Sequence, residues 1–341
     1  MFIGDFNLET DGTYIIAEMS ANHNGSLQIA LDTIKEAKKC GANAIKLQTY
    51  TADTITLNSK ENDFMIDGGT LWDGKNLYDL YQESFTPWEW HKELFEYARN
   101  INIDIFSSPF DKSAVDFLEQ FNPSAYKIAS FEITDYELIK YTASKMKPII
   151  ISIGIAYEEE IKEAVNICRS VGNNDIVLLK CTSSYPALLE DANLLTIPLI
   201  SNKFDVVAGF SDHTIGSTAP IIAVALGAKV IEKHFIINKS IGGSDADFSM
   251  DSKDFKLMIK NIKDTEKLLG IVDFTMNKTK EKNRRYCRSI YVCKDIKKGE
   301  TLTNENLKSV RPGYGMHPKY LNEVLGNIAS KDYKFGNRFE R

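Results

Sequence analysis

The sequence predicts an α/β protein, a (β/α)8 TIM barrel followed by a small C-terminal domain. Eight short β-rich runs recur over the first 240 residues. Segments with helical periodicity lie between them, and this alternation over about 250 residues is typical of a barrel. No G-x-G-x-x-G follows the first run, as a dinucleotide-binding sheet would need, so a doubly wound open sheet is the second choice.

The eight predicted strands are rich in β-branched and aromatic residues and are bounded by turn residues. They span residues 14–20, 44–50, 104–110, 125–130, 148–154, 176–183, 207–213 and 230–235. The first helix, residues 26–41, has apolar residues at the i, i+3, i+4, i+7 spacing and ends at Gly41. Comparable patterns span residues 86–100, 111–121, 134–146, 158–172, 216–228 and 252–269.

Residues 51–86 interrupt this rhythm. The connection is too long for a plain loop between a strand and a helix, and inserted segments of that size are usually functional. We expect the segment to overhang the face of the barrel that carries the active site.

Three parts are predicted along the chain: a barrel over residues 1–272, a linker over 273–287 and a C-terminal domain over 288–341. The linker is polar and basic and has little apolar periodicity. The pattern K-D-x-K-x-G occurs at residues 294–299 and again at 331–336. Two similar turns predict a small all-β domain built from two similar halves.

Composition argues against several classes of protein. The net charge is −6 and the basic residues are dispersed, which is unlike a nucleic-acid binder. The longest apolar stretch, residues 219–228, is far shorter than the roughly 20 residues that cross a bilayer, and the N-terminus does not resemble a signal peptide. The five cysteines form no C-x-x-C pair, which predicts reduced thiols in the cytoplasm. We expect neither nucleic acid nor a membrane as a partner.

Polar side chains gather toward the ends of the predicted strands, where the active site of a (β/α)8 barrel lies. Lys46 and Lys127 lie on the second and fourth strands, among several hydroxyls. Lysines and hydroxyls that converge on one mouth predict a site for phosphate or carboxylate. The alternative is that these lysines are structural and pair with Glu18 or Glu132.

Two histidines, His213 and His234, end the seventh and eighth predicted strands. Neutral imidazoles on adjacent strands can bind one divalent cation, with water and substrate oxygens in the remaining positions. The alternative is a pair of core histidines with satisfied hydrogen bonds. Side chains alternate along a strand, so Glu232 and His234 are expected to point into the barrel and Lys233 outward, as a surface lysine. Glu232 is then expected to support a barrel lysine rather than to act as a catalytic acid.

Several motifs, taken in order, resemble those of the sialic acid synthase family. They are A-E-M-S-A-N-H-N-G, I-K-L-Q-T-Y, F-S-S-P-F, Y-K-I-A-S-F-E, K-C-T-S-S-Y-P, G-F-S-D-H-T and I-E-K-H-F. The stretch S-V-R-P-G-Y-G-M-H-P, residues 309–318, is similar to the C-terminal antifreeze-like (SAF, β-clip) domain of those synthases. The resemblance covers essentially the whole chain.

The resemblance implies a transferase that condenses phosphoenolpyruvate with a six-carbon amino sugar, giving a nonulosonic acid and phosphate. Within the family, A-E-M-S-A-N-H, G-G-T-L-W-D and L-Y-Q-E-S-F-T-P-W-E-W-H are most similar to pseudaminic acid synthases. Ser20 stands where N-acetylneuraminate and legionaminate synthases typically have Gly, and G-S-D at residues 243–245 stands where they have G-P-D. The implied sugar is 2,4-diacetamido-2,4,6-trideoxy-β-L-altropyranose, with the sugars of those two synthases as alternatives. A 6-deoxy sugar calls for an apolar patch, which residues 51–86 could supply.

The resemblance also implies roles for individual residues, motif by motif. Seven would hold phosphoenolpyruvate: Lys46, Ser108, Lys127, Ser130, Ser152, Ser183 and Ser211. Two, His213 and His234, would bind a divalent metal cation, Mn, Mg or Co. Four would face the sugar or its attacked carbonyl: Glu18, Gln48, Tyr185 and Asp245. Glu132 is the candidate for handling the protons of water, with Glu18 as the second choice.

Two further implications concern the C-terminal domain and one of the serines. Arg311, in R-P-G, would reach the barrel of the partner subunit and contact the N-acyl group of the sugar. This implies a homodimer with swapped C-terminal domains. Ser183 stands where sialic acid synthases usually have Asn, so this position departs from the pattern of the family.

Two other functions stay open from the sequence. One is a Schiff-base aldolase that uses Lys46 or Lys127, since barrel lysines form iminium ions readily. The other is a non-catalytic carbohydrate-binding or ice-binding protein with an antifreeze-like domain. A binding module has no need of lysines, acids and histidines in one mouth, which favours the synthase.

Overall fold

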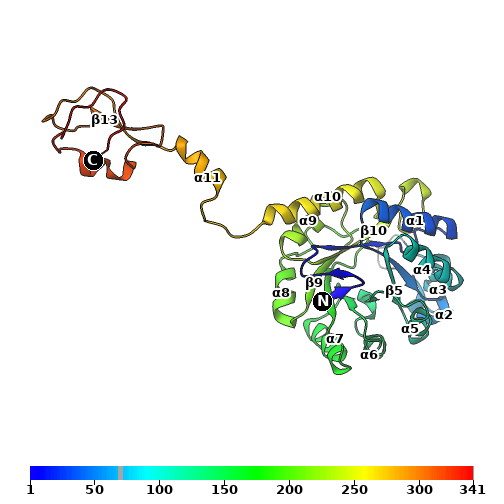
Figure 1. Ribbon diagram of the computed structural model, residues 1–341. Coiled ribbons are helices and arrows are strands. Elements are labelled where there is room, and N and C mark those ends of the chain that lie inside the picture. The colour runs from blue at the N-terminus through cyan, green and yellow to red at the C-terminus, as the bar shows by residue number, and fades with distance from the viewer. Residues whose placement is uncertain (68–71, 341) are drawn as a thin grey trace. The chain divides into compact units, whose positions relative to one another are not determined.

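The computed structural model describes residues 1–67 and 72–340, so Gly68 to Leu71 of the G-G-T-L-W-D motif lie outside the described residues. The chain forms two compact units, Met1–Gly270 and Ile271–Arg341 (Figure 1). Each unit has its own hydrophobic core. No helix in the described ranges combines the length and the apolar character needed to span a membrane.

Within the described part of the first unit, eight parallel strands form a closed barrel. They are β3 (Tyr14–Glu18), β4 (Ala44–Thr49), β5 (Asp104–Pro109), β6 (Tyr126–Ile128), β7 (Ile149–Ser152), β8 (Ile176–Cys181), β9 (Val207–Asp212) and β10 (Val230–Ile236). Each strand pairs with the next, and β10 pairs with both β9 and β3, which closes the sheet. A short strand, β11 (Met250–Asp251), pairs with the end of β10. The predicted barrel is confirmed, and the doubly wound open sheet is wrong.

Helices follow the strands and surround the barrel (Figure 1). They are α1 (Leu27–Cys40), α4 (His91–Asn100), α5 (Lys112–Glu119), α6 (Tyr136–Ala143), α7 (Glu158–Ser170), α8 (Thr196–Phe204), α9 (Thr218–Ala225) and α10 (Ser252–Leu269). The sequence determines their ends: at α1 the Ser26 side chain accepts a hydrogen bond from the N–H of Ile29, and Gly41 ends the helix at a φ of 99°. Outward-facing strand residues such as Ile15 and Ile45 are buried beneath these helices.

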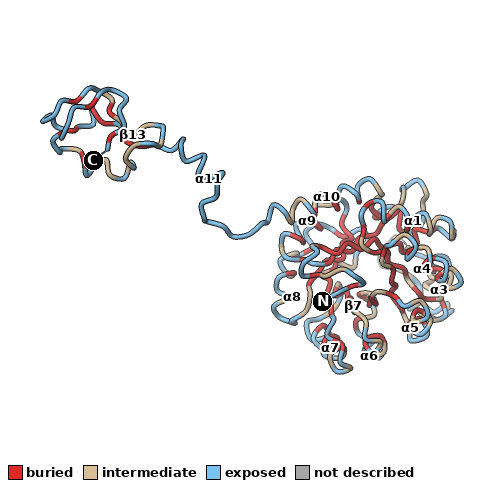
Figure 2. Tube along the Cα trace, viewed as in Figure 1, coloured by how far each residue is buried: buried red, intermediate tan, exposed pale blue. Residues whose placement is uncertain are grey.

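The barrel strands are buried (Figure 2), and the N-terminal half of the barrel interior is apolar. It is filled by Tyr14, Ile16, Ala44, Phe106, Ala125, Ile150, Val177, Leu179 and Val230. A hairpin of β1 (Phe2–Ile3) and β2 (Phe6–Asn7) adds Ile3 and Leu8 to this cluster. The hairpin therefore closes the end of the barrel at which the strands begin.

One long-range contact ties the start of the first barrel strand to the last helix of the unit. The backbone N–H and the hydroxyl of Thr13 both donate to Oε1 of Glu266, at 2.6 and 2.7 Å, across 253 positions of the chain. Thr13 immediately precedes β3, and Glu266 lies in the last turns of α10. The carboxylate thus satisfies two polar groups that no strand partner satisfies.

The inserted segment of residues 51–86 is partly helical. It contains α2 (Ala52–Ile55), η1 (Asn62–Phe64) and α3 (Leu77–Ser84), and η2 (Trp88–Trp90) follows it. Between η1 and α3 the chain doubles back, and Met65 pairs antiparallel with Asn76. The N–H of Ile66 donates to the carbonyl of Lys75 at 3.0 Å, and the N–H of Gly74 donates to the carbonyl of Ile66 at 2.8 Å. These backbone hydrogen bonds fix the position of Ile66.

The second unit is a small β-rich domain. The strands β12 (Ser289–Val292) and β13 (Leu307–Val310) pair antiparallel around a core that includes Ile290, Leu302 and Phe339. Two short helices, α11 (Lys278–Asn283) and η5 (Arg284–Tyr286), lie in the segment that the sequence predicts as a linker.

The repeated K-D-x-K-x-G turns of this unit lie against each other. Asp295, in the first turn, accepts a hydrogen bond from the N–H of Phe335 at 2.7 Å. Asp332, in the second turn, accepts one from the N–H of Lys298 at 2.8 Å. Each aspartate therefore closes the other turn, which confirms that the two turns are similar. The domain is not all-β as predicted, because η6 (Pro318–Tyr320) and α12 (Leu321–Val324) lie between the turns.

Candidate active site

The C-terminal half of the barrel interior is polar. Inward-facing positions there carry charged or hydroxyl side chains that are at most 4% exposed: Glu18, Lys46, Ser108, Lys127, Ser211 and Glu232. They lie on β3, β4, β5, β6, β9 and β10. The alternation of side chains along each strand places these residues directly above the apolar filling.

Two lysines and two glutamates form one buried charge network. Nζ of Lys46 lies 2.6 Å from Oε2 of Glu18 and 3.7 Å from Oε1 of Glu232. Nζ of Lys127 lies 3.3 Å from the same oxygen of Glu232, to which Ser211 donates at 3.1 Å. Lys46 thus pairs with Glu18, as the structural alternative expects. Lys127 pairs with Glu232, so the expectation that Glu232 supports a barrel lysine is confirmed.

Burial and pairing act in opposite directions on the pKa values of this network. Burial lowers the pKa of Lys127 and raises the pKa of Glu18, because both groups lose the hydration of their charge. Burial also acts to raise the pKa of Glu232, but Lys127 and Lys46 outweigh it and hold that pKa below its ordinary value. Glu232 is therefore the carboxylate that stays ionised between the two lysines.

A group of hydroxyls surrounds Gly154, just after β7. The N–H of Gly154 donates to Oγ of Ser130 at 3.2 Å. A Cβ at this glycine would lie 2.3 Å from Oγ of Ser183 and 2.9 Å from Oγ of Ser130, so a larger residue would displace both hydroxyls. Ser152 is 2% exposed, and its Oγ has no hydrogen-bond partner among the described residues. A buried hydroxyl without a partner is unfavourable, and an oxyanion such as phosphate would accept its hydrogen bond.

The two predicted metal ligands lie side by side at the ends of β9 and β10. The ring centroids of His213 and His234 are 5.4 Å apart. Nδ1 of His213 lies 2.8 Å from the carbonyl oxygen of Thr182, which assigns the proton to Nδ1 and leaves the lone pair on Nε2. Nδ1 of His234 is buried without a hydrogen-bond partner among the described residues, and Oδ2 of Asp245 is 3.9 Å from it.

The chemistry of these imidazoles fits a divalent cation in part. Burial lowers the pKa of His234 well below its ordinary value, and nearby His213 and Lys46 lower it further, so the ring is neutral. A neutral imidazole with an unpaired nitrogen is a metal ligand by type. In the part of the chain that the structure describes, no cluster of three or more His, Cys, Asp or Glu side chains could hold a metal ion. Water and substrate oxygens would therefore have to complete the coordination.

A cavity of about 400 Å³ opens at the ends of the strands. Its polar side includes Ser20, Gln48, Glu132, Tyr185, His234 and Asp245. The cavity therefore lies directly beside the histidine pair and within reach of a half-buried carboxylate.

That carboxylate, Glu132, lies in η3 (Ser130–Glu132), directly after β6. Its Oε2 has no hydrogen-bond partner among the described residues. Burial raises the pKa of Glu132 to about 7, with Lys127 acting against the shift. Glu18, by contrast, is held by Lys46 and by Nε2 of Gln48 at 3.0 Å. The geometry makes Glu132 the better candidate for proton transfer near neutral pH.

Lys233 points outward from β10, but it is not a surface residue. It is 2% exposed, its Nζ lies 2.5 Å from Oδ2 of Asp212 on β9, and it donates to the carbonyl of Thr214 at 2.7 Å. The helices cover the outer face of the strands, so an outward charge there must find its partner inside the protein. The prediction of a surface lysine is wrong.

The remaining predicted residues divide between the two units. The ring of Tyr185 packs against that of His213, with centroids 4.3 Å apart, and Asp245 accepts a hydrogen bond from the N–H of Ala21 at 3.4 Å. Arg311 lies just after β13 in the second unit and is exposed, so its contact with a sugar stays a prediction.

Two residues of the site were not identified from the sequence. Gly154 is the last residue of a predicted strand, in I-S-I-G, and a glycine at a strand end was the available signal. Cys181 ends β8, is 2% exposed, and has its Sγ 3.7 Å from Nδ1 of His213. The sequence alone identifies it only as a reduced thiol, because its neighbours in space are distant along the chain.

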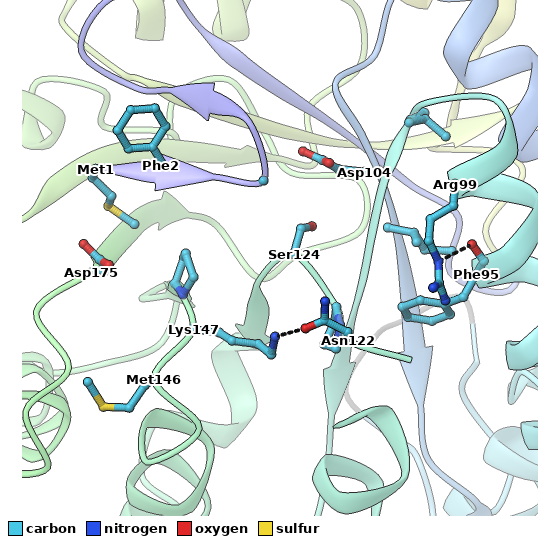
Figure 3. A pocket seen from close by; sticks show the side chains of 15 residues that line it. Met1, Phe2, Phe95, Arg99, Asp104, Asn122, Ser124, Met146, Lys147 and Asp175 are labelled. Carbon is cyan, nitrogen blue, oxygen red and sulfur yellow. Dashed lines mark hydrogen bonds between the residues drawn. The ribbon is translucent and has the colours of Figure 1, made fainter. Parts of the chain in front are cut away.

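A cavity of about 530 Å³ lies at the opposite end of the barrel, beside the N-terminal hairpin (Figure 3). Several of its polar side chains have partners: Lys147 donates to Oδ1 of Asn122 at 2.5 Å, and Arg99 donates to the carbonyl of Phe95 at 3.3 Å. Oγ of Ser124 has none among the described residues. This cavity is larger than the one at the strand ends, but it is not lined by the histidines or by the lysine–glutamate network, so it is the weaker candidate.

Comparison with known proteins agrees with this geometry. Residues 33–273 match the NeuB family, and residues 288–334 match the SAF domain. A pseudaminic acid synthase of Campylobacter jejuni subsp. jejuni serotype O:2 is 51% identical over 341 residues, which are 100% of this chain and 99% of the relative. A pseudaminic acid synthase of Helicobacter pylori is 53% identical over 321 residues, 94% of each chain.

A solved structure gives the same result for the fold. The N-acetylneuraminic acid synthetase of Leptospira borgpetersenii serovar Hardjo-bovis matches with a TM-score of 0.71 at 30% identity, over 80% of this chain and 90% of that one. The resemblance to the sialic acid synthases and the predicted SAF domain are confirmed. Since the family match spans well over half of the sequence, the chain belongs to the NeuB family.

Proposed function

We propose that this protein condenses phosphoenolpyruvate with 2,4-diacetamido-2,4,6-trideoxy-β-L-altropyranose and water, giving pseudaminic acid and phosphate. The observation that carries the proposal is the convergence of two buried lysine–glutamate pairs and several serine hydroxyls at the strand ends, where Oγ of Ser152 is buried without a partner among the described residues. The chain in which they converge is 51% and 53% identical to relatives named pseudaminic acid synthase.

Phosphoenolpyruvate carries a phosphate and a carboxylate, and the site offers donors for both. The hydroxyls of Ser130, Ser152 and Ser183 surround Gly154 and suit the phosphate. Lys46 and Lys127 are already neutralised by two carboxylates, so a bound anion adds negative charge beside them. Glu18, whose pKa burial raises, is the carboxyl that would take up a proton to compensate.

The reaction forms one carbon–carbon bond and breaks one carbon–oxygen bond. C3 of phosphoenolpyruvate adds to the aldehyde carbon of the open-chain sugar, whose oxygen takes up a proton. Water adds to C2 and loses a proton to Glu132, and the resulting hemiketal phosphate releases inorganic phosphate by C–O cleavage. Glu132 suits this step because it lines the cavity and has a pKa raised by burial to about 7.

His213 and His234 would hold the metal. Polarisation of the aldehyde oxygen by a Lewis acid is the chemistry that a divalent cation, Mn, Mg or Co, would supply there. The carbonyl of Thr182 fixes the tautomer of His213, and the ring of Tyr185 packs against the same imidazole. These contacts hold the imidazole of His213 in one orientation.

Two further features belong to the proposal. A homodimer with swapped C-terminal domains would bring Arg311 of one chain to the barrel of the other, where it would contact the N-acyl group of the sugar. A location in the cytoplasm is expected, because the five cysteines are free of disulfides in the structure.

The proposal is tested by offering the purified protein phosphoenolpyruvate with each of three sugars. They are 2,4-diacetamido-2,4,6-trideoxy-altrose, its gluco-configured legionaminate counterpart and N-acetylmannosamine, and phosphate release is compared. We expect the altrose to be preferred. A preference for either other sugar would assign a legionaminic or N-acetylneuraminic acid synthase instead. If none of the three sugars leads to phosphate release, a carbohydrate-binding protein would be favoured.

A second experiment separates the synthase from a Schiff-base aldolase. Borohydride in the presence of substrate traps an aldolase covalently through its lysine, and a chelator leaves such an enzyme active. For this protein we expect no covalent adduct, loss of activity with EDTA, and recovery with Mn²⁺ or Mg²⁺. A borohydride adduct on Lys46 or Lys127 would contradict the proposal.

A further inference from the structure

We propose that Ile66 and Leu77, in the inserted segment, select a sugar that carries a methyl group at C6. The inference rests on the proposed function and deepens it. Both residues line the cavity at the strand ends, and both have aliphatic side chains that cannot transfer a proton or bind a metal. They are therefore specificity determinants, and they are not catalytic residues.

The inserted segment forms an apolar wall of this cavity. It contributes Ile55, Ile66, Trp72, Leu77, Leu80, Tyr81 and Ser84 to the lining. Ile55 ends α2, Ile66 follows the bridge residue Met65, and Leu77 and Leu80 lie on α3. The insertion that the sequence singles out thus gives the cavity a mostly apolar surface.

The wall is held in place by packing and by backbone hydrogen bonds. Leu80 is 8% exposed. The ring centroid of Tyr81 lies 5.6 Å from that of Tyr50, which directly follows β4 and is 3% exposed. Two backbone hydrogen bonds, of 3.0 and 2.8 Å, fix Ile66 on the opposite arm. A wall fixed in this way can discriminate between substituents, because it does not move aside for a larger polar group.

The polar groups of the cavity determine which end of the sugar meets the wall. Gln48, His234 and Glu132 lie on the polar side, where the aldehyde carbon C1 must react. C6 is at the other end of the six-carbon chain and therefore falls against the apolar wall. A methyl group there replaces water by hydrocarbon contact, whereas a hydroxymethyl group would bury its O–H against Ile66 and Leu77, which offer no hydrogen bond.

The test compares two sugars that differ only at C6. They are 2,4-diacetamido-2,4,6-trideoxy-L-altrose and its 6-hydroxy counterpart, and kcat/KM is measured from phosphate release. An apolar pocket discriminates against one added hydroxyl by about 10- to 100-fold, and we expect the native protein to prefer the 6-deoxy sugar by this factor. Ile66→Thr and Leu77→Asn should reduce the preference to about threefold or less, since each supplies a polar partner.

Matched controls separate polarity from shape and position. Ile66→Val is close in shape to Ile66→Thr but stays apolar, so it should keep most of the preference. Leu57→Asn makes the same exchange as Leu77→Asn in the same segment, at a side chain that is 67% exposed and does not line the cavity. It should leave the preference unchanged. Thermal unfolding of each variant verifies that it is folded.

The outcomes distinguish the inference from the function on which it rests. Equal efficiency with the two sugars, or a full preference in folded Ile66→Thr and Leu77→Asn, would overturn the role of the wall and leave the synthase intact. If neither sugar leads to phosphate release, the proposed function is overturned, and the role of the wall is overturned with it.

Discussion

At its N-terminal end the barrel is filled by Tyr14, Ile16 and Phe106 beneath a hairpin, whereas at its C-terminal end it is filled by two lysines and two glutamates. Both halves are equally buried and are built on the same strands. The apolar half is stable without any partner, because burial of hydrocarbon is favourable by itself. The charged half is stable only while each charge keeps its counter-charge.

The difference between the two halves shows where this fold keeps its function. The apolar half stabilises the barrel by burying hydrocarbon, and the hydroxyl of its Tyr14 already donates to Oδ2 of Asp104 at 2.6 Å. The polar half includes a serine without a hydrogen-bond partner and a glutamate with a pKa of about 7. Groups in such unfavourable states persist where a substrate is to satisfy them.

The strongest way to break the contrast is to remove one charge from the polar half. Glu232→Leu leaves Lys127 without its carboxylate at 3.3 Å and Lys46 without its second one. We expect the free energy of unfolding to fall by about 3–5 kcal/mol, because a buried charge is left unpaired, and activity to be lost. Urea unfolding and phosphate release measure the two effects.

The double variant Lys127→Met/Glu232→Leu is the control for that experiment. It replaces both members of the buried ion pair by apolar side chains, so no charge is left unpaired there. Most of the lost free energy of unfolding should return, while activity stays absent. A double variant that is no more stable than Glu232→Leu would show that the unpaired lysine is not the cause.

The next largest effect is expected at Glu132, whose pKa is raised by burial. Glu132→Gln should lower kcat by about 10²- to 10⁴-fold. In the native protein kcat should fall as the pH drops through about 7, because the carboxylate that accepts the proton becomes protonated. The variant should lack this dependence in a pH profile of phosphate release.

A nearby glutamate serves as the comparison for this pH profile. Glu137 lies on α6, is exposed, and pairs with Lys112 at 3.2 Å on the surface. Glu137→Gln should leave both kcat and its pH dependence as they are. If Glu132→Gln keeps the native pH profile, another group carries the proton.

A smaller effect should follow from filling the space at Gly154. In Gly154→Ala the new Cβ would lie 2.3 Å from Oγ of Ser183, so the hydroxyls around it must shift. We expect kcat/KM for phosphoenolpyruvate to fall by about 100-fold, as misplacement of binding groups by about 1 Å has that effect. An unchanged KM for phosphoenolpyruvate in this variant would remove these hydroxyls from the phosphate site.

The smallest effect belongs to the apolar half. Ile16→Val removes one methylene from a fully buried residue and should lower the free energy of unfolding by about 0.5–1.5 kcal/mol. Activity should stay within about twofold of native, because Ile16 lies below the charged groups. A large loss of activity would mean that the two halves are coupled, and the contrast between them would fail.

Most of the fold could be predicted from the sequence, because nearly every barrel strand is a short β-rich run followed by a helical period; the exception is α8 (Thr196–Phe204), which was not predicted from the sequence. The side on which Glu232 lies also followed from alternation along one strand. The error at Lys233 has a physical cause: the outer face of a barrel strand is not the surface, since helices cover it. The partner of Lys233, Asp212, lies on the neighbouring strand, and pairing across strands is not visible in one segment.

The site could be predicted only in part. The serines and histidines stand at strand ends and are visible there. Gly154 and Cys181 act through neighbours that are distant along the chain, so their place in the site needed the closed barrel. The position of the inserted segment also needed it, because the pattern of residues 51–86 indicates a long connection without indicating which residues line the cavity.

The contact between Thr13 and Glu266 has a consequence for how the protein is made. At about 5–20 residues per second, the 253 positions between them correspond to roughly 13–50 s of synthesis. For most of that time β3 lacks its neighbour β10, and a strand with an open edge can pair with another chain. Nascent chains that end before β10 are therefore expected to aggregate, and synthesis of α10 afterwards supplies the carboxylate that holds Thr13.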